Sequence, residues 1–265
     1  MKTFSKILII ALAAVALGAI ASQAQESAEE IMKKSHLAYY YAGDDGVAQV
    51  SMRIIDKRGK ERTREFVMLR TDQSDGGDQM YYTYFKKPSD VSRMTFMVHK
   101  HGDEQDDRWI YIPAVDLVKR ISADDKNSSF VGSDFSYEDV SGRHWSQDTH
   151  EVLGDSTWDG SAVWIIESTP KGDWAFDKKI SYIDQDTYLP HREDYYKDGE
   201  VVKVMNAEET KEADGIMTIV HRTMEDLKDE RITHVIFDNI DYNTGVKDDI
   251  FTERYLVNPP MQYIQ

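Results

Sequence analysis

Short segments in which apolar and polar residues alternate constrain this chain more than any other feature of its sequence. In VAQVSMRIID, the residues Ala48, Val50, Met52 and Ile54 share one side, and the polar residues between them face the other way. Successive side chains of a β-strand point to opposite faces, so this pattern indicates a strand with one buried and one wet face.

Further segments of this kind follow at short spacing. They are REFVMLR, QMYYTYF, MTFMVHK, DRWIYI, AVWIIEST, KKISYID, REDYYKD, EVVKVMNAEE, IMTIVHRTMED and RITHVIFDNI. Asp-Gly pairs, the strongest short hairpin signal, separate several of them at residues 159–160, 198–199 and 214–215. Helices do not alternate with the strands, which argues against a parallel sheet. We therefore expect a mainly β fold, with one curved antiparallel sheet of about 11 strands.

A few helices are expected around this sheet. Ser27 and Glu30 fit a capping box, and the helix that begins there should run to about Tyr41. Further helices are expected over residues 133–144, with Ser133 as N-cap, and over residues 248–255. A long meander has to hide its edges, so the economical architecture is a whole or partial barrel that these helices cap.

The first 24 residues have the pattern of a secretory signal peptide. Lys2 and Lys6 precede an apolar run over residues 7–20, and Ser22-Gln23-Ala24 offers small residues for cleavage. A membrane anchor is the alternative, but the run is marginal for a span and ends in a processing-like sequence. We expect residues 1–24 to be removed from an exported protein whose residues 25–265 form one domain.

Composition excludes several classes of protein. The formal charge is −16, which makes a nucleic-acid partner improbable because phosphate binding needs a basic surface. The chain has no cysteine, so it has neither a disulfide framework nor the lipid-bearing cysteine of a bacterial lipoprotein. The core of the sheet has to stabilise the fold by itself.

The apolar positions of the expected strands are unusually often aromatic or methionine residues. Methionine adapts to irregular apolar guests. Core packing explains any single one of these residues, but the whole set favours a cavity that holds lipid. The set is Met52, Phe66, Met68, Tyr82, Tyr84, Phe96, Met97, Trp109, Tyr111, Trp164, Tyr182, Tyr195, Met205, Met217, Met224 and Phe237.

Metal and cofactor sites find little support in the sequence. His99 and His101 would share one face of a strand, but a polar turn follows them, so we expect a solvated strand end and not a zinc site. The acidic segment 124–127 lacks the glycine and the distal glutamate of a calcium-binding loop. No metal and no cofactor is expected.

The segment VGSDFSYED has two interpretations. Its carboxylates Asp134, Glu138 and Asp139 could form the acid/base pair of a hydrolase. Alternatively, they are caps and ion-pair partners that hold a short helix over the sheet, with Lys119 or Arg120 pairing with Asp134 or Asp139. The second interpretation accounts for the serines as well, so we expect a protein that is not an enzyme.

Three stretches resemble a known family. They are FKKPSDV at residues 85–91, DDRWIYIPA at residues 106–114, and VKRI at residues 118–121 followed by SFVGSDFSYED at residues 129–139. In these residues the chain resembles exported bacterial outer-membrane lipoprotein-sorting proteins with a LolA/LolB-like fold. It departs from them at Arg93, where members of the family usually have glycine, and it is longer than LolA, which lacks the last series.

The resemblance implies an unclosed half β-barrel around an apolar cavity, with helices as a lid. It implies a monomeric periplasmic carrier that shields acyl chains of a lipoprotein or lipid between an inner-membrane transporter and an outer-membrane acceptor. A non-enzymatic accessory subunit of an inner-membrane lipid exporter is the alternative, and a carboxylate-dependent hydrolase is a third. We expect Arg120 to hold the lid. The residues expected to line or close the cavity are Phe96, Trp109, Tyr111, Phe130 and Phe135.

Overall fold

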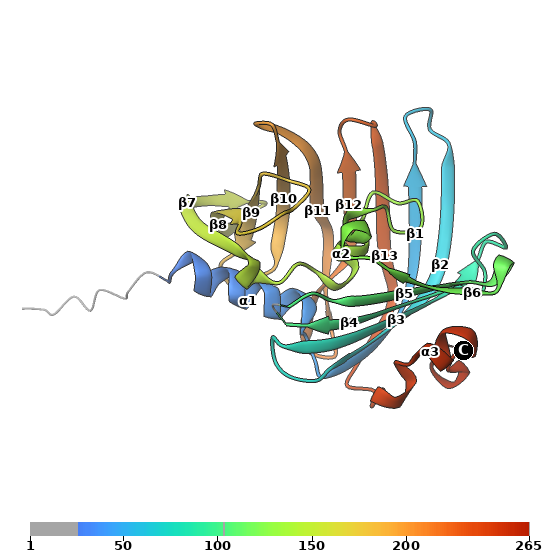
Figure 1. The fold of residues 1–265 in the computed structure, drawn as a ribbon. Helices are drawn as coiled ribbons and strands as arrows, with labels where there is room; N and C mark the ends of the chain where they lie inside the picture. The colour runs from blue at the N-terminus through green and yellow to red at the C-terminus, as the bar shows by residue number, and fades with distance from the viewer. Residues whose placement is uncertain (1–25, 103, 265) are drawn as a thin grey trace, which may run out of the picture.

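The computed structural model describes residues 26–264 except residue 103, and these form one antiparallel sheet with few helices (Figure 1). The expected signal peptide, residues 1–24, lies outside the described residues. The strands are β1 (Asp45–Ile55), β2 (Glu61–Asp72), β3 (Asp78–Lys87), β4 (Thr95–His101), β5 (Asp107–Ile112), β6 (Leu117–Ile121), β7 (Asp148–Trp158), β8 (Ser161–Pro170), β9 (Lys178–Asp184), β10 (Pro190–Lys197), β11 (Glu200–Ala213), β12 (Ile216–Asp226) and β13 (Arg231–Tyr242). The helices are α1 (Ala28–Tyr40), α2 (Tyr137–Ser141) and α3 (Glu253–Val257), with short 3-10 helices η1 (Pro113–Val115), η2 (Asp124–Asn127), η3 (Trp145–Gln147), η4 (Asp248–Ile250) and η5 (Met261–Tyr263).

The predicted fold class is confirmed. Strands follow one another in the order β6-β5-β4-β3-β2-β1-β13-β12-β11-β10-β9-β8-β7, so β1 and β13 meet in the middle and the sheet does not close into a barrel. The sheet has 13 strands instead of about 11, because the segments expected to form strands did not include the two edge strands, β6 and β7. Only Ile121 of β6 and Asp148 of β7 are buried, so these strands have little apolar alternation to reveal them.

The Asp-Gly hairpins are also confirmed. Asp159, Asp198 and Asp214 have φ values of 47°, 53° and 51°, and the glycine after each has a positive φ as well. Two successive residues of this kind form the turn whose twist matches that of paired strands. Arg93, which replaces the glycine usual in the family that the sequence resembles, has a φ of 67°, a value that favours glycine.

A long connection crosses the open side of the sheet. Residues 122–147, here called the strap, leave β6 at one edge and enter β7 at the other edge. The strap contains η2, α2 and η3, and Figure 1 shows α2 in front of the middle of the sheet. The strap therefore does what a closing pair of strands would do in a barrel, because it covers the concave face.

Helix α1 begins as the sequence predicts. Ser27 and Glu30 form a capping box, with the Glu30 amide donating to Ser27 Oγ at 3.2 Å. Ala28, Ile31 and Met32 pack on β8 and β9, where they meet the fully buried side chains of two isoleucines. Half of the helix is thus fixed over the β7–β9 end of the sheet, and its C-terminal half extends toward the middle.

Helix α2 begins later than predicted. Its N-cap is Ser136, whose hydroxyl accepts from the Asp139 amide at 3.1 Å, and the Asp139 carboxylate accepts from the Ser136 amide at 2.7 Å. Ser133 instead donates its hydroxyl to the carbonyl of Phe130 at 2.7 Å, which stabilises a turn before the helix. After the helix, Gly142 lies so close to the Tyr40 ring of α1 that a Cβ at this position would overlap the ring.

Both faces of β2–β5 are buried, because alternation sends neighbouring residues to opposite sides. On the concave face, Phe66, Phe85 and Phe96 pack with Phe130 and Phe135 of the strap. On the convex face, side chains of the same strands pack under the C-terminal segment of residues 246–264. These convex side chains are Val67, Leu69, Tyr82, Met97, Trp109 and Tyr111.

Asp134 holds the strap to β13. Its side chain is fully buried; Oδ1 accepts from Arg231 Nε at 2.5 Å, and Oδ2 accepts from Thr233 Oγ1 at 2.6 Å. The prediction that Lys119 or Arg120 is the partner of Asp134 is wrong. β6 lies at the edge of the sheet, whereas Asp134 of the strap contacts β13 in the middle of the sheet.

We predict that Asp134→Asn lowers the free energy of unfolding by about 2 kcal/mol or more, because it leaves the Arg231 cation without its buried partner. Urea denaturation followed by circular dichroism measures this. Asp124→Asn, an exposed change in the same strap, should alter stability by less than about 0.5 kcal/mol. Equal stability of the two variants would show that Asp134 does not fix the strap.

Candidate functional site

An apolar cavity of about 110 Å³ lies between α1 and the concave face of the sheet. A smaller pocket of about 20 Å³ adjoins it under the strap, and the two share Met68, Val140, Arg222 and Phe237. The walls come from α1, from the central strands β1, β2, β12 and β13, and from α2. The cavity therefore sits where the two ends of the strand series meet and where α1 and α2 cover the sheet.

Arg70 of β2 holds the C-terminal end of α1 over this cavity. Its guanidinium donates to the main-chain carbonyls of Tyr40 and Ala42, and to that of Gly43 at 2.7 Å. The last carbonyls of a helix have no partner within the helix and carry partial negative charge, so a cation stabilises them. Asp72, at 3.6 Å, compensates part of the arginine charge.

Lys100 of β4 does the same for α2. Its ammonium is buried and donates to the carbonyls of Ser141, at 2.8 Å, and Gly142. Burial lowers the pKa of Lys100 to about 8, because the charged form loses its hydration. The covering helices α1 and α2, whose ends meet at Tyr40 and Gly142, are thus both held by cations on the concave face.

Arg222 of β12 lies in the wall of the cavity itself. Its guanidinium packs over the rings of Phe135, Tyr39 and Phe237, with centroids at 5.0, 5.6 and 5.7 Å. It donates to the Tyr39 hydroxyl, which belongs to α1. An arginine in this place brings a cation into surroundings that are otherwise apolar.

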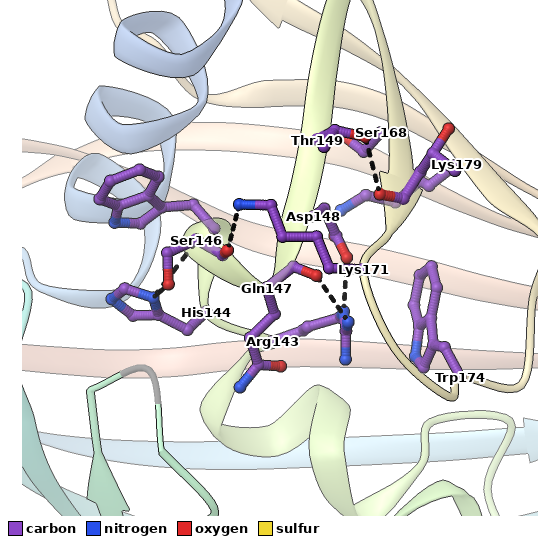
Figure 2. Close-up of polar contacts among 12 residues, drawn as sticks. Arg143, His144, Ser146, Gln147, Asp148, Thr149, Ser168, Lys171, Trp174 and Lys179 are labelled. Carbon is purple, nitrogen blue, oxygen red and sulfur yellow. Dashed lines mark hydrogen bonds and ion pairs between the residues drawn. The ribbon is translucent and has the colours of Figure 1, made fainter.

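A second cavity, polar and about 430 Å³, lies beside the end of the strap. Figure 2 shows polar contacts at the end of the strap, where Arg143, Gln147 and Lys171 are among the residues that line this cavity. Arg143 Nε donates to Asp148 at 2.9 Å, Arg143 Nη2 to the Gln147 carbonyl at 3.2 Å, and Lys171 to the Ser146 carbonyl at 2.8 Å. These contacts fasten the strap where it enters β7, which gives them a structural role.

The structure brings three of the expected cavity residues together. Phe96, Phe130 and Phe135 all lie in the concave cluster, each at most 4% exposed. Phe130 and Phe135 line the smaller pocket, whereas Phe96 supports Phe130 from below with ring centroids 5.2 Å apart.

Two other expected cavity residues lie on the opposite face. Phe96 pairs with Ile110, so Trp109 and Tyr111, on either side of Ile110, point away from the cavity. They pack instead with the C-terminal segment on the convex face. Trp109 and Tyr111 were expected beside Phe96 because all three side chains are large and aromatic. The alternation of the strands places them on the opposite face from Phe96.

Arg120, expected to hold the lid, is 66% exposed and pairs with Asp107 of the neighbouring strand. The structure does not bring it to α1 or to α2. Arg70 and Arg222, which do contact α1, were not among the expected site residues. A signal for Arg70 was present, because alternation places it on the same face as Phe66 and Met68, where a cation is unusual.

Metal ligands do not gather in the part of the chain that the structure describes: it contains no group of three or more His, Asp or Glu residues suited to a metal ion. His99 contacts the Phe251 carbonyl at 2.9 Å, and His101 lies 3.2 Å from Asp107. Each of these rings has its own partner. None of the helices within residues 26–264 is long and apolar enough to cross a membrane.

We predict that Arg70→Met loosens the end of α1, because its final carbonyls lose their donors. Hydrogen exchange followed by mass spectrometry should report faster exchange of the α1 C-terminus, with α1 residues near Ile31 unaffected. Arg58→Met, at an exposed turn, is the matched control. Unchanged protection of the Tyr41 amide, which donates to Leu37 at 3.0 Å, would contradict this role of Arg70.

We predict that Lys100 makes stability rise with pH above about 8. Its folded pKa of about 8 is below the ordinary value of 10.5, so between these values the unfolded chain binds more protons. The free energy of unfolding of the wild type minus that of Lys100→Met should therefore increase from pH 8 to pH 10. A Lys57→Met control, at an exposed turn, should give a constant difference. A constant difference for Lys100→Met as well would refute the prediction.

Comparison with known proteins places the chain among related structures. A DUF1329 family protein from Desulfovibrio piger is 29% identical, with a TM-score of 0.79, over 85% of this chain and 97% of that one. A putative outer membrane lipoprotein-sorting protein domain from Vibrio parahaemolyticus is 25% identical, with a TM-score of 0.80, over 87% and 98%. A LolA superfamily protein from Nitrosomonas europaea shares the fold at 18% identity and a TM-score of 0.67, over 87% and 99%.

Curated proteins gave no match. A family model described as an uncharacterized protein matches residues 77–258, which is more than half of the chain. The resemblance inferred from the sequence is confirmed, and its most specific segment, residues 129–139, lies within the match. The chain belongs to this family of uncharacterized proteins, and its structural relatives include DUF1329, outer membrane lipoprotein-sorting and LolA superfamily proteins.

Proposed function

We propose that this protein is a periplasmic carrier that shelters the acyl chains of a lipoprotein or lipid on their way toward the outer membrane. The observation that carries the proposal is the apolar cavity between α1 and the concave face, in a fold shared with lipoprotein-sorting proteins. An acyl chain gains about 0.8 kcal/mol for each methylene taken out of water, so an apolar cavity provides the driving force.

The walls of the cavity suit a guest of irregular shape. Met68 and Phe237 belong to both adjoining pockets, and Met52 lines the smaller one. Methionine side chains are flexible and polarisable, so they repack around different chains. The acidic exterior, with a formal charge of −16, keeps such a carrier dispersed in water.

Loading requires the covering elements to move. The cavity volume of about 110 Å³ is below the roughly 300–1,000 Å³ typical of small-molecule sites. Arg70 and Lys100 hold α1 and α2 through main-chain carbonyls, and such hydrogen bonds exchange readily with water once the covering elements lift. We infer that the C-terminal half of α1 and the part of the strap that contains α2 lift from the sheet to admit a chain.

The carboxylates of the strap support a carrier more than a hydrolase. Asp134 is bound to Arg231 and Thr233, and Asp139 caps α2. Glu138 accepts from Lys126 at 2.7 Å and from Trp174 at 3.0 Å. Each carboxylate therefore already has partners that hold the strap, which is the role expected of caps and ion pairs.

We predict that Ala48→Phe weakens binding of an apolar probe by filling the cavity, whose wall includes Ala48. The wild-type protein, stripped of lipid, should raise the fluorescence of the neutral probe N-phenyl-1-naphthylamine at micromolar concentrations. Ala48→Phe should weaken this binding at least about tenfold, because an occupied cavity leaves no room for a guest.

Ala162→Phe is the matched control, since Ala162 lies exposed on β8 away from the cavity and should bind as the wild type does. Absence of probe binding by the lipid-free wild type would overturn the proposal. It would then favour an accessory subunit of an inner-membrane lipid exporter that carries no cargo itself. Mass spectrometry of lipids that remain bound after mild purification identifies the cargo.

A further inference from the structure

The charge of Arg222 has no acidic partner. Among the described residues, no Asp or Glu oxygen lies within 4.0 Å of its guanidinium nitrogens. Its Nε atom is buried and has no hydrogen-bond partner. The hydrogen bond that its Nη1 atom donates goes to a neutral group, the hydroxyl of Tyr39.

Arg64 and Arg108, the buried arginines of this sheet, differ from the partly buried Arg222 in this respect. Arg64 and Arg108 also leave Nε without a partner, but Asp90 lies 3.5 Å from Arg64 and Asp106 lies 2.6 Å from Arg108. Each of them has a carboxylate as an ion-pair partner, whereas Arg222 does not.

The acidic residue that lines the smaller pocket with Arg222 is already engaged. Asp139 accepts from the Ser136 amide at 2.7 Å, as the cap of α2, and lies 3.9 Å from Lys203. A cation in apolar surroundings is costly unless an anion or several hydrogen bonds compensate it. The aromatic rings around Arg222 supply only part of this compensation through cation–π contact.

We propose that Arg222 binds the anionic head group of a single-chain amphiphile, a carboxylate or a phosphate, whose hydrocarbon chain occupies the apolar cavity. This proposal rests on the carrier function above and specifies its cargo. Nε and an Nη atom of an arginine present parallel donors that match the two oxygens of such a group. The acidic exterior does not attract anions, so selection of the head group depends on this interior cation.

The position of Arg222 also couples cargo to the covering elements. Its guanidinium contacts Tyr39 of α1 and the Phe135 ring of the strap. Because the bond to Tyr39 uses Nη1, an anion held by Nε and Nη2 lies next to this contact between α1 and the sheet. Arg70 is not available for the same task, because carbonyls of α1 and Asp72 occupy its donors.

The test compares three probes with the same chain on lipid-free wild-type protein at pH 8. Dodecanoate, dodecyl phosphate and dodecan-1-ol compete with N-phenyl-1-naphthylamine in the fluorescence assay. We expect at least one of the two anions to bind about tenfold or more tightly than the alcohol. The tighter anion tells whether the head group is a carboxylate or a phosphate. Sodium acetate and inorganic phosphate, which lack a chain, should not compete at the same concentrations.

Variants assign the preference to Arg222. Arg222→Met should remove the advantage of the anions and leave the alcohol binding as before or more tightly, whereas Arg222→Lys should retain part of the advantage. Arg53→Met, at an exposed position of β1, is the control and should behave as the wild type. Circular dichroism establishes that the variants fold. The comparison of the three probes on the wild-type protein tests the anion preference even where a variant does not fold.

The outcomes separate this inference from the carrier function. Equal affinity of the wild type for the anions and the alcohol overturns the inference and leaves the carrier function standing. An anion preference that survives in Arg222→Met overturns it as well. Failure of the wild type to bind any of the three probes, or N-phenyl-1-naphthylamine itself, overturns both.

Discussion

Cations on the concave face of the sheet hold the main-chain carbonyls at the ends of α1 and α2, and the closed form of the molecule depends on these contacts. An open sheet with an apolar concave face has to be covered, and the covering elements need fixed positions. Arg70 and Lys100 supply charge where the helix carbonyls lack partners. The Tyr40 ring against Gly142 then joins the two covering elements to each other.

This arrangement combines firm and weak attachment. Asp134 fixes the strap to β13 through a buried ion pair, and the N-terminal half of α1 is fixed by apolar packing on β8 and β9. Over the cavity, main-chain carbonyls and the Tyr39 hydroxyl add polar contacts to the apolar packing of Phe135 and Val140. Local opening is easier where fewer buried apolar contacts have to break. A carrier that has to load and release needs its mobile part at this place.

Much of the fold followed from local patterns. The period-two alternation located the central strands, the Asp-Gly pairs located hairpins, and Ser27 with Glu30 located the start of α1. Edge strands β6 and β7 were not counted, because a strand paired on one side only does not require apolar alternation. The start of α2 was placed at Ser133 instead of Ser136, since both serines precede acidic residues and only the fold shows which hydroxyl accepts from the helix.

The candidate site was predicted less completely. Phe96, Phe130 and Phe135 were recognised and do lie together, whereas Trp109 and Tyr111 lie behind the sheet. Alternation relative to Phe96 predicts that Trp109 and Tyr111 lie on the convex face. It does not predict that a C-terminal segment covers that face. Arg120 has the chemistry expected of a residue that holds the lid, yet it lies on an edge strand far along the order of the sheet from β12.

The sequence by itself determined that the chain forms an antiparallel sheet with an apolar, methionine-rich face, and that segment 129–139 marks its family. These properties depend on residues close in sequence, where the periods of strands and turns operate. The tertiary structure decided which residues meet across the open side: Arg70 with the end of α1, Lys100 with the end of α2, and Arg222 with both α1 and the strap. Those contacts join residues far apart in the chain, and only the curvature of the sheet and the path of the strap bring them together.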